Sequence, residues 1–184
     1  MTQTTLSDNF PKWTIVGLLP HGTAALYTPN SLSVDVIIDQ LRDCIKNAGK
    51  FLGYRALAGE VIVVDEIHNE ADLERLLLTN VCRLLVINPL SNFKVNKLTL
   101  APTRHIDYFI LNRLAQRFKV TILVAPEKRT DAVDFAVDTL ITFMIPTTAD
   151  DNAPYRFKVE ARDLPLIRGN ATFNPASGTL EVAK

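Results

Sequence analysis

Two kinds of hydrophobic pattern alternate along most of this chain. Short continuous apolar runs are separated by segments in which apolar residues recur every three or four positions. The continuous runs, typical of strands buried on both faces, lie within residues 24–27, 58–64, 83–87, 120–124 and 139–145. The periodic segments, typical of amphipathic helices, are residues 34–45, 69–77, 103–118 and 130–137. This alternation predicts an α/β fold with three layers, α/β/α, around a mostly parallel central sheet.

The pattern changes near the C-terminus. Between Tyr155 and Arg162, apolar residues alternate with charged residues, which is the period of two expected for a half-exposed strand. Turn-forming residues separate two further short runs, 171–173 and 179–182. These segments predict antiparallel strands that extend the parallel sheet.

The composition is ordinary for a soluble globular protein, with 47% hydrophobic and 22% charged residues among 184. Twenty basic side chains balance twenty acidic ones, which disfavours a strongly basic nucleic-acid binder but allows a local basic patch. No apolar run approaches 18 residues and no signal peptide opens the chain, so we expect a cytoplasmic protein that does not enter a membrane. We expect residues 1–12 to form a loose arm and residues 13–184 a single domain.

The residues that most often bind metals or act as nucleophiles are scattered. Cys44 and Cys82 match no metal-ligand spacing, and we expect both to be reduced thiols in the core. His21, His68 and His105 are isolated from one another and are expected to be structural. The sequence therefore predicts no metal site and no catalytic residue.

Residues Gly17 to Leu41 are predicted to form a strand, a tight turn and a helix, which is the layout of a phosphate-binding loop. A working loop needs glycines that let the backbone approach the phosphates, a lysine, and a serine or threonine for the metal. The positions of the turn hold other residues instead, namely Thr28, Pro29, Asn30, Ser31 and Ser33. Val34 falls at the lysine position and Asp35 at the metal-binding hydroxyl, although Ser31 or Ser33 can still cap the helix. A carboxylate about 4 Å from a phosphate repels it by roughly 1–4 kcal/mol, so only weak nucleotide binding is left open.

Four segments of the chain carry a family resemblance. They read GLLPHG, LLVINPLSNF, LAQRFKVTILVAPEKR and VEARDLPLIRGNATFNPASGTLEV. With them the chain, roughly from Trp13 to Val182, resembles the RecA-like ATPase core of the RepA-type and DnaB-type helicases. The resemblance implies a RecA-like fold and places Asn88 where the family has the aspartate that holds magnesium.

The same resemblance assigns further positions. Ala125 and Pro126 stand where the family carries its sensor residues. Asp65 or Glu66 would be the acid that orients the attacking water. Arg162 matches the arginine of the closing segment that reaches a neighbour's nucleotide, whereas Glu160 stands at the lysine of that segment.

Together these departures imply a catalytically inactive copy of the family. The lysine, the metal hydroxyl, the metal aspartate and the sensor are all replaced, and losing one charge-stabilising group alone typically costs about 10²–10³ in rate. We therefore expect a non-catalytic protein without a cofactor. It would act by forming oligomers, by binding a RecA-like replication or recombination partner, or by binding single-stranded DNA, and it could originate from a phage or mobile element.

Two other functions remain open at this stage. One is a protein–protein inhibitor similar to the cell-division inhibitor SulA, which is RecA-like without a phosphate-binding loop. The other is a divergent ATPase that uses Asp35, Asp65 or Glu66 for metal. The side chains that could contact a partner or DNA are basic and either follow strand ends or lie on the strand 155–162. They are Lys94, Lys97, Arg104, Lys128, Arg129, Arg156, Lys158 and Arg162.

Overall fold

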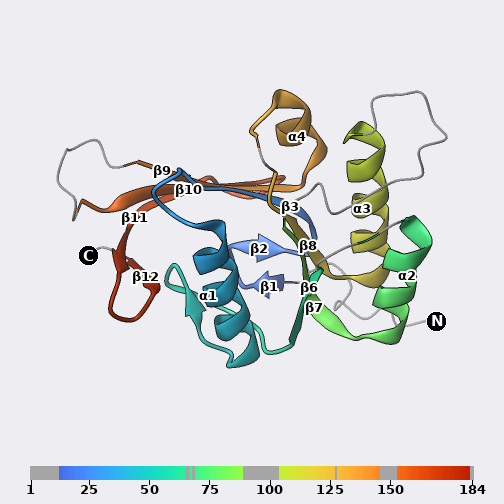
Figure 1. Cartoon of the computed structure of the whole chain (residues 1–184), viewed down its shortest axis with the longest axis horizontal. Coiled ribbons are helices and arrows are strands. Elements are labelled where there is room, and N and C mark those ends of the chain that lie inside the picture. Colours follow the sequence, from blue (N-terminus) through green and yellow to red (C-terminus); the bar gives the residue numbers. More distant parts are fainter. Residues whose placement is uncertain are drawn as a thin grey trace, which may run out of the picture.

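The structure is a computed structural model that describes residues 13–64, 67, 69–88, 104–126, 128–145 and 153–182. An eight-stranded sheet in the spatial order β12-β11-β10-β9-β3-β8-β7-β6 forms its centre (Figure 1). Its strands are β3 (Gly22–Tyr27), β6 (Glu60–Val64), β7 (Cys82–Ile87), β8 (Thr121–Val124), β9 (Thr139–Met144), β10 (Tyr155–Ala161), β11 (Ile167–Asn174) and β12 (Thr179–Val182). The helices are α1 (Val34–Lys46), α2 (Glu70–Thr79), α3 (Arg104–Phe118) and α4 (Asp131–Ala136).

The strand directions confirm the predicted α/β class with a mostly parallel sheet. Strands β9, β3, β8, β7 and β6 are parallel neighbours, and β10, β11 and β12 extend the sheet in antiparallel fashion from β9. Each parallel strand coincides with one of the apolar runs of the sequence. Four of them, β3, β7, β8 and β9, are buried, because a strand covered on both faces needs apolar side chains on both. The prediction of a buried strand is wrong for β6, which lies at the edge of the sheet with Val63 37% exposed. The likeness to RecA in particular remains a prediction.

Two apolar cores lie on opposite faces of the sheet. One packs α1 against the sheet through Ile37, Ile38, Leu41 and Ile45, which are all at most 4% exposed. The other core contains side chains of α2, α3 and α4 and the opposite face of the same strands. The helix α1 begins after Ser33, whose side chain caps it, and its buried residues follow the spacing that the sequence predicts.

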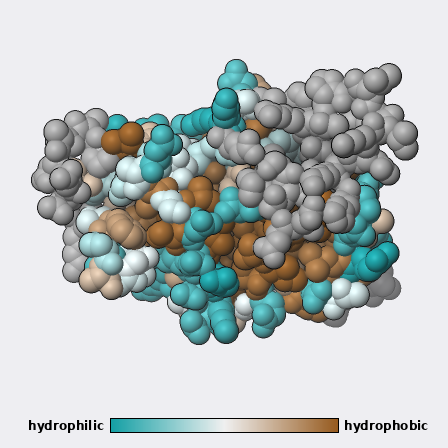
Figure 2. Space-filling model, in the orientation of Figure 1, coloured by the Kyte–Doolittle hydropathy of each residue, from teal (hydrophilic) through white to brown (hydrophobic). Residues whose placement is uncertain are grey.

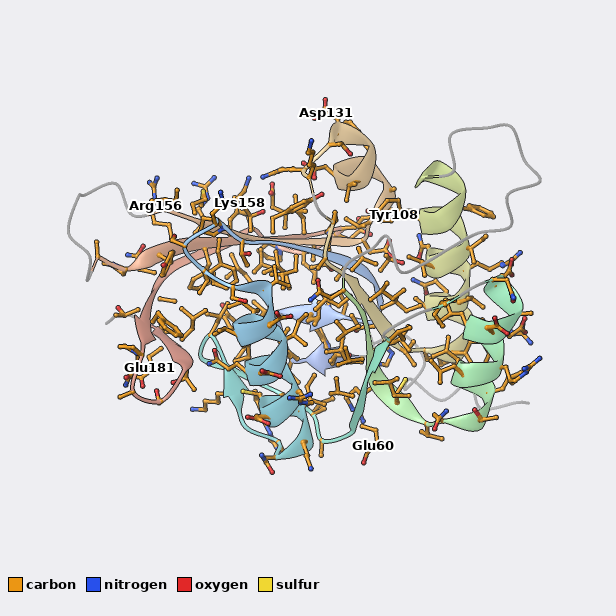
Figure 3. The ribbon with its side chains drawn as sticks, in the orientation of Figure 1. Glu60, Tyr108, Asp131, Arg156, Lys158 and Glu181 are labelled. Atoms are coloured by element: carbon orange, nitrogen blue, oxygen red, sulfur yellow. The ribbon has the colours of Figure 1, made fainter. Side chains whose placement is uncertain are left out.

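The antiparallel strands contribute to one core only. On β10, Phe157 and Val159 are buried in the α1-side core, whereas Arg156 and Lys158 point to the side of the sheet from which α4 rises (Figure 3). On β11, the exposed Arg168 lies opposite Lys158 in the ladder. Hydrophilic side chains accordingly line the upper edge of the molecule in Figure 2. This outer face is the half-exposed face that the alternation predicts.

The outer edge of β12 is occupied by a side chain. The Gln40 amide donates a hydrogen bond to the carbonyl oxygen of Leu180 (2.8 Å) and accepts one from its backbone nitrogen (2.9 Å). Gln40 belongs to α1, so the helix takes the place that a further strand would have at this end of the sheet.

Some local features differ from the sequence prediction. Two short antiparallel ladders were not predicted, and they pair β1 (Trp13–Ile15) with β2 (Leu19–Pro20) and β4 (Lys50–Phe51) with β5 (Tyr54–Arg55). Strands of two or three residues are too short to show a period. The helical period predicts that Phe109 faces inward, which is wrong: Phe109 is 71% exposed, and Tyr108 and Leu111 are buried instead.

Gly169 makes room for an aromatic ring in the α1-side core. A Cβ added at this position would lie 2.5 Å from Cζ of Phe157, which is 3% exposed. We predict that Gly169→Ala lowers the free energy of unfolding by about 1–3 kcal/mol, because the ring must move within a packed core. Urea denaturation measures this change. The neighbouring substitution Asn170→Ala, on the exposed face, should stay within about 0.5 kcal/mol of the wild type, and equal losses in both variants would contradict this packing.

Candidate functional site: the closed loop and the α4 groove

The turn between β3 and α1 is filled by its own side chains. The backbone nitrogen of Leu32 donates to the carbonyl oxygen of Pro29 (2.9 Å), and the Leu32 side chain, 3% exposed, belongs to the α1-side core. The hydroxyl of Tyr155 on β10 donates to the carbonyl oxygen of Ser31 (3.1 Å). None of the residues 28–33, all of which the structure describes, has a positive φ. The alternation of right- and left-handed residues that forms an anion-binding nest is therefore absent from this turn.

The first turn of α1 also lacks the features of a phosphate site. Ser33 Oγ accepts a hydrogen bond from the backbone nitrogen of Asp35 (3.2 Å), and the Asp35 carboxylate lies in the first turn, where it interacts favourably with the helix dipole. Val34, at the lysine position, packs against the α1-side core. Groups of the protein thus fill the places that an anion and a lysine would take.

The two positions that hold the metal in a working site are bonded to each other. Asn88, directly after β7, donates a hydrogen bond from Nδ2 to Oδ1 of Asp35 at 2.9 Å. By the predicted alignment, Asp35 stands where a working site has a hydroxyl, and Asn88 stands where it has a carboxylate. Their hydrogen bond engages Oδ1 of Asp35 within the protein.

Some predicted site residues cannot be placed. The candidate acids Asp65 and Glu66, and the candidate contacts Lys94 and Lys97, lie outside the described residues. Arg104 begins α3, but its side chain is outside the described set as well. Within the described part of the chain, no three His, Cys, Asp or Glu side chains are grouped so that they could hold a metal ion.

Three of the predicted basic residues come together. Arg129 follows β8, Lys158 lies on β10, and Arg162 follows β10, yet all three line a groove of about 430 Å³ between α4 and β10, which we call the α4 groove. Lys128 and Arg156 are exposed near this groove but do not line it. The sequence thus identified basic residues that share a surface, although nothing in their spacing showed that α4 would form its wall.

The sequence did not reveal that each cation has an acidic partner. Arg129 donates from both Nε and Nη2 to Oδ2 of Asp134 at 2.9 and 2.8 Å. Lys158 pairs with Glu160 at 2.7 Å, and Arg162 lies 3.6 Å from Asp138. The α4 groove therefore carries three positive and three negative side chains, and it is not a patch of one sign.

Asp138 also joins the neighbouring strands β3 and β9. Its Oδ2 accepts a hydrogen bond from the backbone nitrogen of Thr23 (3.1 Å), and its own backbone nitrogen donates to the carbonyl oxygen of Thr23 (2.8 Å). Gly22 adopts φ +144°, and a Cβ there would lie 2.6 Å from Oδ2 of Asp138, so only glycine fits. Arg162 is consequently held near the amino ends of β3 and β9, away from the loop of its own chain.

Tyr27 ends β3 beneath Arg129, whose guanidinium carbon lies 5.6 Å from the centre of its ring. The side chain is 9% exposed, and its hydroxyl is buried without a hydrogen-bond partner of normal geometry. Burial, with a smaller contribution from the nearby Asp134 carboxylate, raises the pKa of Tyr27 to about 12, although Arg129 and the amide of Thr130 act in the opposite direction.

Comparison with known proteins assigns no family. No protein-family model matches the chain, and a search of curated proteins gives no match.

In the part of the chain that the structure describes, no helix has both the length and the apolar character needed to cross a membrane. The features of this protein that bear on function are therefore the closed loop and the α4 groove.

Tyr27 and Tyr155 allow a matched test of hydroxyl hydrogen bonding near the loop, because the structure gives a partner only for the Tyr155 hydroxyl. Because the folded-state pKa of Tyr27 exceeds the unfolded value of 10.0, its contribution to stability is complete below pH 10 and is lost as the pH rises towards 12. We predict that Tyr27→Phe changes the free energy of unfolding at pH 7 by less than about 1 kcal/mol. Between pH 10 and 12, the free energy of unfolding of the variant should fall by roughly 1–3 kcal/mol less than that of the wild type. Denaturation by urea across this pH range measures both effects.

Tyr155→Phe is the control, because this hydroxyl has a partner in Ser31. We expect it to cost about 0.5–1.5 kcal/mol at pH 7. A larger loss at pH 7 from Tyr27→Phe than from Tyr155→Phe would show that the Tyr27 hydroxyl is bonded after all.

Proposed function

We propose that this protein is a non-catalytic RecA-like domain that acts by binding other macromolecules. The observation that carries the proposal is the hydrogen bond from Asn88 to Asp35. A working phosphate-binding loop brings a hydroxyl and a carboxylate to these positions, and both bind the magnesium ion. Here the amide donates to the carboxylate instead, so one carboxylate oxygen that a cation would use is engaged within the protein.

The architecture supports the RecA-like part of the proposal. The loop leaves the central strand β3, the helix α1 follows it, and Asn88 follows a strand two places away in the sheet. This arrangement, with antiparallel strands added beyond β9, is compatible with a RecA-like core. Such a domain would work in the cytoplasm, either as an oligomer or bound to an active RecA-like protein of replication or recombination, for example in a phage or mobile element.

A nucleotide-binding measurement tests the loop. We predict that a fluorescent ATP analogue with Mg²⁺ binds the wild type no more tightly than about 1 mM, since the turn is filled and Asp35 repels phosphate. Phosphate release should equal that of buffer. Binding in the micromolar range or steady turnover would overturn the proposal.

The triple variant Val34→Lys, Asp35→Thr, Asn88→Asp separates the causes of this inertness. It introduces the lysine, the hydroxyl and the carboxylate of a working loop but leaves Leu32 in the turn. We expect it to bind nucleotide weakly if at all, because the backbone is still closed. Micromolar binding by the triple variant would show that the replaced groups, and not the filled turn, keep nucleotide out of the wild type.

The outer face of the sheet favours a second function, the binding of single-stranded DNA. On this face, the exposed Arg156 of β10 lies opposite the uncharged Asn170 of β11. Two residues further along β10, the partly exposed Lys158 lies opposite the exposed Arg168. Cations along an uncovered sheet can follow a phosphate backbone. The Glu160 partner of Lys158 weakens the site, so we place this function second.

The salt dependence of binding tests this second function. If the face binds DNA, the triple variant Arg156→Gln, Lys158→Gln, Arg168→Gln should bind a labelled oligothymidine more weakly at low salt. The slope of log K against log salt should fall by about 0.7 for each cation that no longer neutralises a phosphate. Fluorescence anisotropy measures both quantities. The control replaces Lys46, Lys50 and Arg75 by glutamine, which removes the same charge from other exposed positions, and equal losses in both variants would exclude a localised site.

A further inference from the structure

An exposed aromatic ring stands beside the α4 groove. Phe135 of α4 is 84% exposed and forms part of the groove wall. The residues two positions before and after it, Val133 and Val137, are 4% and 5% exposed and anchor the helix in the core. The ring is therefore held outward by a fixed element. Aromatic side chains in such positions supply much of the energy of protein–protein interfaces.

The groove beside this ring is lined by both charged and apolar side chains. Val137, Leu140 and Ala161 form a small apolar floor, and the more numerous charged side chains around them form three ion pairs. A polar rim beside an aromatic anchor is a common arrangement in protein interfaces. The groove and the ring of Phe135 thus provide a hollow and a projection on one surface.

The balance of charge distinguishes between partners. A nucleic acid would bring phosphates close to Asp134, Asp138 and Glu160, which repel them. A second copy of the chain presents the same equal numbers of positive and negative groups, so opposite charges can face each other across a twofold axis. The surface is therefore complementary to itself in charge and in having both a projection and a hollow.

We propose that the α4 groove is the interface of a symmetric dimer, in which Phe135 of each subunit enters the groove of the other. The inference rests on the proposed function and names the partner, a second copy of this chain, and the surface by which it assembles. Arg129 and Arg162, which both line the groove, would set the register of the subunits through the partner's carboxylates.

Sedimentation velocity of the full chain tests the dimer. We expect the wild type to form a dimer with a dissociation constant below about 100 µM. Phe135→Glu should raise that constant at least about tenfold, because a charge replaces the apolar ring that would be buried. The matched control is Val81→Glu, since Val81 is 95% exposed at the start of β7 and lies outside the groove. This control should leave the dimer unchanged. Circular dichroism checks that both variants fold.

Cross-linking locates the contact independently. Phe135→Cys should form a disulfide-linked dimer on mild oxidation, whereas Val81→Cys should not. A wild type that stays monomeric at about 100 µM, or a dimer that Phe135→Glu leaves intact, would overturn the interface. Loss of oligothymidine binding in Phe135→Glu, without any dimer in the wild type, would overturn it in favour of DNA. If the wild type is a monomer and does not bind ATP, the dimer is refuted and the proposed function is not. If the wild type is a dimer and hydrolyses ATP, the proposed function is refuted and the dimer is not.

Discussion

The position of β3 in the middle of the sheet determines where the candidate functional surfaces of this protein lie. It has β8 on one side and β9 on the other, both parallel to it, and the connection from β8 to β9 must therefore cross it. Open α/β sheets bind ligands at the carboxyl ends of strands around such a point. The closed loop leaves this edge towards α1, and Arg129 reaches it from the side of α4. The closed loop and the Arg129 end of the α4 groove depend on this placement, whereas Arg162 lies towards the amino ends of β3 and β9.

The loop between β3 and α1 is closed by contacts made within the protein. Leu32 fills the turn, Tyr155 satisfies one of its carbonyl oxygens, and Asn88 satisfies the carboxylate on α1. Polar groups that are bonded within the protein must give up those bonds before they can bind a ligand. Replacement of a single residue would leave an open but weakened site, whereas these contacts stabilise the closed form.

The sequence predicted the parallel strands and α1 well, because a doubly covered strand must be apolar throughout and because Ser33 is a strong helix cap. It could not give the order of the strands, since β9 lies beside β3 although more than a hundred residues separate them. The candidate site was likewise predicted only in part. The unusual residues at positions 35 and 88 were visible, but their hydrogen bond spans 53 positions and follows no local pattern. The carboxylate partners of Arg129 and Arg162, and the exposure of Phe135, depend on tertiary packing.

The hydrogen bonds of Gln40 to Leu180 have a consequence for how copies of this protein can join. A sheet that is extended by adding strands from one molecule to the next needs an unpaired edge strand at each end. At the β12 end, an incoming strand would have to displace a side chain that already makes both backbone bonds, and the helix behind it would have to move. Continuous fibrils built by sheet extension are thereby disfavoured, whereas assemblies of limited size, which do not need the β12 edge, stay open.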